Sequence, residues 1–200
     1  MLNAQPSSDV ALTITSSDTG EATVTSLITF TSANWDTTQT VTVTGVDDDL
    51  IDGTISSTLT VAVLDAISDD DFDGVADQTV SVSTTDDDVA GFTVAETEGS
   101  TGVTEAGGTD TFTVVLNAQP DSDVVLSIIS SDTGEATVTS SLTFTSANWD
   151  TAQTVTVTGA DDDLVDGTVS STTTISVVDA ASDNNFCLLY TSDAADDSLR

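Results

Sequence analysis

The sequence predicts an all-β protein, in the form of tandem antiparallel β-sandwiches, from three observations. Short runs alternate between apolar and polar side chains, which is the pattern of half-buried strands. Val, Ile and Thr are abundant, and Thr alone makes up roughly a fifth of the 200 residues. These residue types favour strands over helices. Finally, one long segment occurs twice, as expected for two copies of a domain.

The repeat begins with LNAQP at Leu2 and again at Leu116, so each residue of 2–72 has a counterpart 114 positions later. About three quarters of these positions are identical, and a unit of this size is a domain rather than a solenoid turn. Residues 88–115 have no equivalent before the first copy, whereas 73–87 close only the first copy. We therefore expect a first unit over 1–87 without its first strands and a second over 88–186 without its last.

The alternating runs follow one another along each unit and are separated by Gly, Asp, Asn and Ser clusters typical of turns. We expect about seven strands per unit, a number typical of a β-sandwich of this size. Sustained helical periodicity is absent from the sequence. The clearest runs are STLTVAV at 57–63, TDTFTVVL at 109–116, SLTFT at 141–145 and QTVTVTG at 153–159.

The charge is extreme, because 35 acidic residues against one basic residue, Arg200, give a formal net charge of −34. Nucleic acid and anionic membrane surfaces are poor partners, since the chain offers nothing that neutralises phosphate groups. Cations are the natural partners. Such acidity often accompanies disorder, but 38% hydrophobic residues suffice for a core. No apolar run reaches the ~18 residues of a membrane span, so we expect no membrane insertion.

Enzymatic activity is not expected. The chain contains neither His nor Lys, so it cannot build Ser-His, Cys-His or Schiff-base arrangements. Its single cysteine, Cys187, excludes an internal disulfide framework. Paired carboxylates can hydrolyse glycosides, but the acidic residues here cluster in loops at strand ends rather than in one cleft.

The first candidate calcium site is the acidic stretch after the run at 57–63. Ca²⁺ takes six to eight oxygen ligands, so it needs several carboxylates that converge from flexible loops. The alternate residues Asp69, Asp71, Asp73 and, beyond Gly74, Asp77 have suitable spacing. Val80 stands where an EF-hand has its bidentate acid, and no helices flank the stretch. A solvated acidic turn is the alternative interpretation.

The second candidate class is the triple-aspartate loop DDDLIDG at 47–53, with its copy DDDLVDG at 161–167. A third triplet, Asp86, Asp87 and Asp88, lies at the boundary between the units. Adjacent carboxylates repel one another strongly unless a cation or water screens them. We therefore expect Ca²⁺ at these clusters. The candidate ligands within the two loop copies are Asp47, Asp48, Asp161 and Asp162.

The order of motifs, LN-x-QP, EATV, LTF, QTVTVTG-x-DD and DG, resembles the Calx-β-like repeats of large bacterial surface and secreted proteins. The resemblance covers residues 2–186, and EAGGTDTFTVVLNAQP is its most specific part. It implies immunoglobulin-like sandwiches that bind Ca²⁺ at one end, near the linker to the next domain. It also implies that Glu96, Asp161, Asp162 and Asp86–Asp88 are ligands. Gly167 departs from the family, which often has a further Glu there.

The aromatic and threonine patterns leave two alternatives open. Trp35 and Trp149 are interpreted as packing residues, with a sugar-stacking platform as the alternative. Threonine rows such as Thr154, Thr156 and Thr158 are interpreted as the solvated face of a strand. The alternatives for these rows are O-linked glycosylation and binding to an ordered surface such as ice.

The copy breaks at residue 187, because CLLYTSDAADDSLR matches nothing in the first unit. The stretch resembles translated sequencing-adapter DNA at the end of a metagenomic contig, so we interpret 187–200 as a non-native tail of an excerpt from a longer repetitive chain. We expect an extracellular or cell-surface structural or adhesive module, stiffened by calcium. Copies of itself are the expected partners, joined into a linear fibre by head-to-tail repetition or strand exchange. The alternative is an adhesin module that binds cell-surface glycans.

Overall fold

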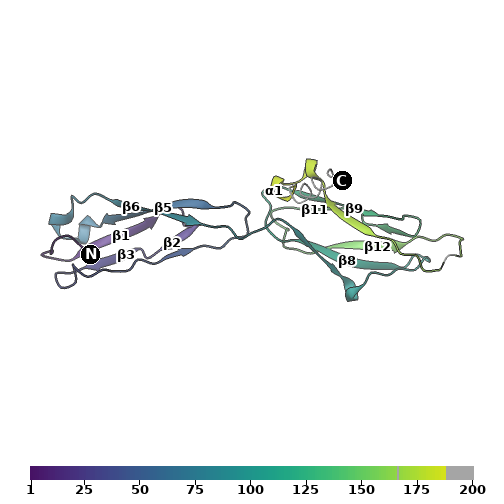
Figure 1. Cartoon of the computed structure of the whole chain (residues 1–200), viewed down its shortest axis with the longest axis horizontal. Coiled ribbons are helices and arrows are strands. Elements are labelled where there is room, and N and C mark those ends of the chain that lie inside the picture. Colours follow the sequence, from purple (N-terminus) through teal and green to yellow (C-terminus); the bar gives the residue numbers. More distant parts are fainter. Residues whose placement is uncertain (166, 188–200) are drawn as a thin grey trace, which may run out of the picture. The chain divides into compact units, whose positions relative to one another are not determined.

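The computed structural model describes residues 1–165 and 167–187, and these divide into two compact units. The first comprises Met1–Asp48 and Asp52–Asp86, and the second comprises Asp49–Ile51 and the chain from Asp87 onward. Both units consist mainly of antiparallel strands with almost no helix, so the all-β prediction is confirmed (Figure 1). The expected tail at 187–200 lies outside the described residues except for Cys187.

The first unit contains a four-stranded sheet in the order β3-β1-β5-β6 and a two-stranded sheet, β2-β4. Two short 3-10 turns follow β5 and lead into the last strand. Its elements are β1 (Val10–Ser16), β2 (Ala22–Val24), β3 (Leu27–Phe30), β4 (Val43–Gly45), β5 (Ile55–Val63), η1 (Asp65–Ile67), η2 (Asp70–Phe72) and β6 (Gln78–Thr84).

The second unit contains a four-stranded sheet in the order β10-β12-β8-β7 and a three-stranded sheet, β11-β9-β13. Its strands are β7 (Phe92–Glu96), β8 (Thr109–Leu116), β9 (Val124–Ser130), β10 (Ala136–Val138), β11 (Ser141–Phe144), β12 (Gln153–Gly159) and β13 (Thr173–Val177). Its helical elements are η3 (Thr97–Gly99), η4 (Asp179–Ala181) and a single turn, α1 (Asn184–Cys187).

One core joins the two sheets of the second unit. The inward side chains of β8 and β12, among them Phe112 and Val155, pack with Leu126 of β9 and Phe144 of β11. Alternation explains this arrangement, because successive strand residues point to opposite faces and the apolar ones lie on the inner face. The unit is therefore sandwich-like. Trp149 packs against this core.

The two units repeat the same strand register. Leu12 of β1 lies opposite Val63 of β5, and their counterparts Leu126 and Val177 lie opposite each other on β9 and β13. Register is specified wherever one face of a strand is buried, because a slip by one residue would turn the apolar face outward. The near-identical alternation in both copies therefore produces near-identical pairing.

The described parts of the units differ where a strand of one has no described counterpart in the other. β12 pairs with β8 from Gln153 to Thr158, but the first unit has no described equivalent of β8, and β4 covers only three residues. Val157 of β12 is 6% exposed, whereas its counterpart Val43 on β4 is 41% exposed. The same residue in the same motif is thus core in one unit and surface in the other.

Candidate metal site

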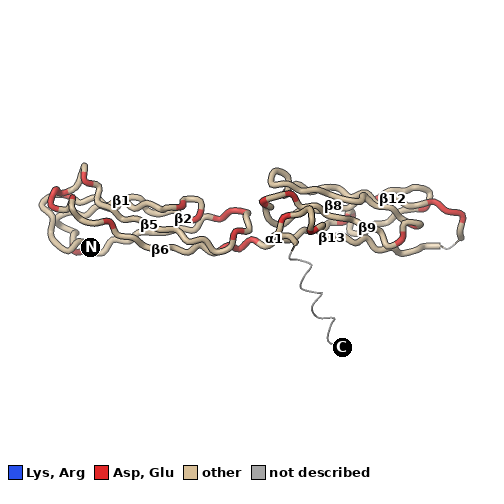
Figure 2. Tube along the Cα trace, turned by 90° about the horizontal axis from the view of Figure 1, so that it is seen from above, with Lys and Arg blue, Asp and Glu red and all other residues tan. Residues whose placement is uncertain are grey.

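Acidic residues gather in the loops at the ends of the strands, as Figure 2 shows in red for each unit. Arg200, the only Lys or Arg of the chain, lies outside the described residues, and the chain has no His. Residues 1–187 therefore contain no Lys, Arg or His side chain. Hydrogen bonds, protonation and cations from solution can each offset the repulsion between neighbouring loop carboxylates.

Three carboxylates converge at one end of the first unit. Ligand oxygens of Glu21, Asp48 and Asp52 all lie within 4.8 Å of one another. Glu21 belongs to the loop between β1 and β2, whereas Asp48 and Asp52 belong to the loop between β4 and β5. Among the residues that the structure describes, this is the one group of three acidic side chains with such spacing.

Backbone hydrogen bonds hold the two loops together. The pairing of β2 with β4 continues past Gly45, where the Val46 amide donates to the Glu21 carbonyl oxygen over 2.9 Å. The preceding turn is closed by the Gly20 amide, which donates to Asp18 Oδ1 over 3.0 Å. Glu21 is therefore held beside the β4–β5 loop by the sheet itself, not by its own side chain.

A second contact joins the β4–β5 loop to the last residues of the first unit. The Gly53 amide donates to Asp86 Oδ2 over 2.8 Å, which ties the β4–β5 loop to the residues after β6. Gly53 has a φ of 77°, a conformation that side chains with a Cβ rarely adopt. The glycine of the DG motif thus permits the turn that follows Asp52 in the chain.

Burial and neighbouring charge raise the pKa of Glu21 above its ordinary value of 4.5. Desolvation is the largest cause, and the carboxylates of Asp52, Asp18, Asp48 and Asp86 add to it in that order. The half-buried Glu21 thus sits in a field that disfavours its charged form. A divalent cation would reverse this effect, because an opposite charge within a few ångströms favours the ionised carboxylate.

The predicted ligand Asp69 has a different environment. Its side chain is buried at 4% exposure, and Oδ2 accepts hydrogen bonds from Ser7 N, Ser7 Oγ and Ser8 N at 2.6, 2.8 and 2.9 Å. Oδ1 accepts from the Asp71 amide at 3.1 Å and so caps η2. These hydrogen bonds, led by that of Ser8, lower the pKa of Asp69 to about 2. The carboxylate fastens the 3-10 turn to the segment before β1.

The same fastening occurs in the second unit. Asp183, the counterpart of Asp69, is 5% exposed and accepts from the Ser122 and Asn185 amides, each over 2.9 Å. There, Asn185 and Cys187 replace Asp71 and Asp73, so the acidic pattern is lost while the fastening is kept. Because the hydrogen bonds recur without the neighbouring acidic residues, Asp69 has a structural role that does not depend on Asp71 or Asp73.

The rest of the predicted set at 69–77 does not form a group of three close carboxylates in the described structure. Asp71, Asp73 and Asp77 are all exposed. The pKa of Asp73 is raised, first by desolvation and then by the charges of Asp65, Asp70 and Asp69. Calcium binding at this loop stays a prediction.

The two triple-aspartate loops differ in how their carboxylates are placed. Asp48 belongs to the cluster, while Asp47 is exposed beside it. In the second copy, Asp161 is exposed, and Asp162 Oδ1 accepts from the Leu164 amide over 2.7 Å. Asp166, the counterpart of Asp52, lies outside the described residues.

The boundary triplet is divided between the units, with Asp86 in the first and both Asp87 and Asp88 in the second. Glu96, the ligand implied on the first strand of the second unit, is exposed on β7. Its Oε1 accepts from Thr101 Oγ1 over 3.4 Å.

Glu21 and Asp52 were missed by the sequence reasoning, which considered the triplets rather than their neighbours. A signal for them exists in the repeat, because Glu21 recurs as Glu135 and the backbone contact recurs with it. The Ala160 amide donates to the Glu135 carbonyl oxygen over 2.8 Å, as Val46 does to Glu21. The sequence did not indicate that the pairing of β2 with β4 brings Glu21 next to the triple-aspartate loop at 47–53.

Comparisons with known proteins add no relative. No protein-family model matches the chain, and no curated protein matches it. In the part of the chain that the structure describes, there is also no helix with the length and apolar character required to cross a membrane.

Proposed function

We propose that this chain is an extracellular or cell-surface structural or adhesive module that binds Ca²⁺ through the carboxylates of Glu21, Asp48 and Asp52. In this proposal the units are immunoglobulin-like, Calx-β-like sandwiches, and calcium stiffens them. The module builds a linear fibre by head-to-tail repetition or by strand exchange. No catalytic activity forms part of the proposal.

The convergence of Glu21, Asp48 and Asp52 is the observation that supports it. Ca²⁺ is a hard cation that prefers oxygen ligands and accepts irregular geometry, so carboxylates from two loops suit it. Three acidic side chains leave several coordination positions for backbone carbonyls and water. Extracellular calcium modules with few charged ligands bind at roughly 10⁻⁴–10⁻³ M, and we expect an affinity in that range.

Repulsion among the carboxylates favours the binding of a cation at this site. In metal-free buffer the pKa of Glu21 is raised by burial and by its acidic neighbours, so ionisation at neutral pH costs folding free energy. Bound Ca²⁺ removes that cost. Because the ion binds the assembled loops and not the unfolded chain, it stabilises the first unit in proportion to the logarithm of its concentration.

The test is a calcium titration of the full chain that reads each unit separately. Trp35 lies in the first unit and Trp149 in the second, so Trp149→Phe leaves a chain whose tryptophan fluorescence reports the first unit. At a calcium concentration of 100 times Kd, stabilisation is about 2.7 kcal/mol. We expect the melting temperature of the first unit to rise by several degrees.

Glu21→Gln and Asp52→Asn should abolish most of this rise. Asp36→Asn removes one charge from an exposed position of the same unit that is outside the cluster, and it should leave the rise intact. Equal responses of all three variants would refute this site. A first unit that melts at the same temperature with calcium and with chelator would refute the calcium part of the proposal altogether.

A further inference from the structure

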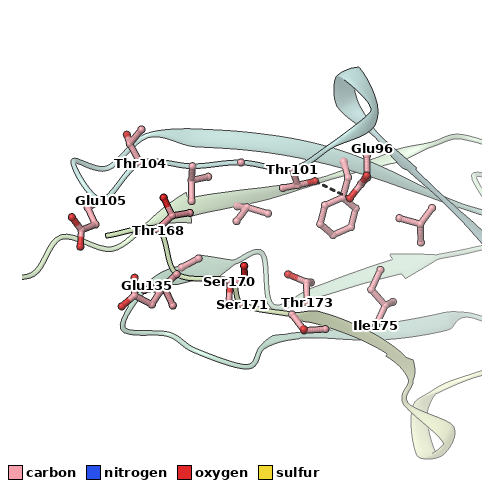
Figure 3. A pocket seen from close by; sticks show the side chains of 18 of the residues that line it. Glu96, Thr101, Thr104, Glu105, Glu135, Thr168, Ser170, Ser171, Thr173 and Ile175 are labelled. Carbon is pink, nitrogen blue, oxygen red and sulfur yellow. Dashed lines mark hydrogen bonds between the residues drawn. The ribbon is translucent and has the colours of Figure 1, made fainter. Parts of the chain in front are cut away.

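A groove of about 940 Å³ opens along the second unit, between β7 of one sheet and β13 of the other (Figure 3). Its apolar lining includes Phe92 and Val94 of β7, Phe112 of β8, Val157 of β12 and Ile175 of β13. Val94 lies opposite Val114 of β8, a residue with 0% exposure in the core, and therefore faces the same way. Val94 itself is nevertheless 45% exposed.

The edge of the three-stranded sheet borders this groove. Within the described residues, β13 pairs with β9 and with no strand on its other side. In the first unit the equivalent strand β5 pairs with β1 and also with β6, through Leu59 opposite Val80 and Ser57 opposite Val82. The position that β6 occupies in the first unit thus has no described strand in the second.

β13 is also shorter than its counterpart β5. β5 spans Ile55–Val63, whereas β13 spans only Thr173–Val177. The four residues 169–172 that should extend it form no strand, although they repeat residues 55–58 with one change. Ser57, opposite Val82 of β6, is 2% exposed, but its counterpart Ser171 is exposed. Residues 169–172 therefore have the sequence of a strand, but no described strand lies beside them.

The strand β6 has the properties that the groove requires. Its sequence, QTVSVST, places Val80 and Val82 on one face and the hydroxyl side chains of Thr79, Ser81 and Ser83 on the other. In the first unit Val80 is 55% exposed, since no described strand covers it there. The strand carries no charge, whereas Glu96, Glu105 and Glu135 line the groove, so an acidic segment would be repelled. Figure 3 shows Glu105 and Glu135 at one end of the groove and Glu96 further along it.

We propose that the second unit is an acceptor for the Gln78–Thr84 strand of a second copy of this chain. In each copy this strand pairs with β5, so the exchange requires it to leave β5 of its own unit. It then adds antiparallel to β13 in the register of the first unit, with Val80 opposite Thr173 and Val82 opposite Ser171. Its two valines then enter the groove over Val94 and Phe112, and residues 169–172 become strand. This addition deepens the strand-exchange route of the proposed function and rests on it, but it requires no calcium.

The first experiment uses a synthetic peptide of residues 78–85, QTVSVSTT, added to the full chain in calcium-free buffer. We expect saturable binding by fluorescence anisotropy and at least tenfold slower hydrogen exchange at the amides of residues 169–177. A peptide with Asp in place of both valines should not bind. Val94→Asp changes an exposed side chain in the groove and should weaken binding at least tenfold, while Val89→Asp, at a 70% exposed position outside the groove lining, should not. Absence of binding, or protection elsewhere in the chain, overturns the proposal.

The second experiment asks whether a second copy supplies the strand. Sedimentation of the full chain should show self-association that grows with concentration and is lost in the Val80→Asp/Val82→Asp double variant. A chain that stays monomeric although it binds the peptide overturns the second-copy assignment. A chain ending at Cys187 that binds the peptide when the full chain does not assigns the edge to residues 188–200 instead. Calcium titrations decide the metal part of the proposed function separately, so either part can fail alone.

Discussion

The substitution of one valine in both copies of the repeat tests how far the neighbouring strand β8 controls stability. Val157 and Val43 are counterparts in the same QTVTVTG motif, and both pair in the same register with the neighbouring ATV strand. Val157 is 6% exposed in the core of the second unit, while Val43 is 41% exposed. Val157→Ala and Val43→Ala therefore make the same chemical change in two different packing environments.

The magnitudes follow from the burial. Truncation of Val to Ala removes the equivalent of two methylene groups, which contribute about 0.8 kcal/mol each when fully buried. At Val157 a cavity term adds to this, because the surrounding core side chains close in only partially, and the total is about 2–3 kcal/mol. At Val43 the side chain already contacts water and no closed cavity forms, so the cost is about 1 kcal/mol or less.

The assay is thermal unfolding followed by the tryptophan of each unit. Trp35→Phe isolates the second unit through Trp149, and Trp149→Phe isolates the first through Trp35. With ~4 °C per kcal/mol as a conservative conversion for domains of this size, Val157→Ala should lower the transition of its unit by about 8–12 °C. Val43→Ala should lower the other transition by about 4 °C or less. Equal shifts would refute the argument that β8 makes the difference.

Two further predictions concern the titration of single carboxylates. The folded-state pKa of Asp69 is about 2, below its ordinary value of 3.8, so its charged form stabilises the fold above pH ~4 and this contribution is lost as the pH falls toward 2. Asp69→Asn should lower stability at pH 7 and flatten its decline between pH 4 and 2 in acid titrations followed by circular dichroism, whereas an unchanged decline would contradict the fastening role. Glu21 has a raised pKa, so its contribution favours the fold at acidic pH and is lost as the pH rises above about 4.5. Glu21→Gln should therefore raise the melting temperature at pH 7 in metal-free buffer, and a lower melting temperature would show that repulsion does not dominate there.

Strands could be predicted from the sequence because the information is local. Alternation at 109–116 and 153–159 anticipates β8 and β12 at the bounds that the structure has. An apolar face on each strand excludes a slip by one residue. The internal repeat also showed which segments have no counterpart, and those segments include β6 in the first unit and both β7 and β8 in the second.

The lengths of β4 and β13 could not be predicted in this way. Each has the sequence of a longer strand, but a strand persists only where a neighbour accepts its backbone hydrogen bonds. Whether that neighbour is present depends on residues far away along the chain. The three-residue β4 and the seven-residue β12 come from the same heptapeptide and differ because only β12 has β8 beside it.

For the acidic loops, too, the sequence predicts one part of the outcome and the tertiary structure decides the other. Composition and turn spacing determined that carboxylates would crowd at the strand ends in a chain with a single basic residue, since both properties can be read residue by residue. Tertiary structure decided what each carboxylate does. Asp69 became a buried hydrogen-bond acceptor because the segment before β1 passes over it, and Glu21 met Asp48 and Asp52 because β2 pairs with β4. The state of a carboxylate depends on which amides, charges and solvent surround it, and only the folded chain determines these surroundings.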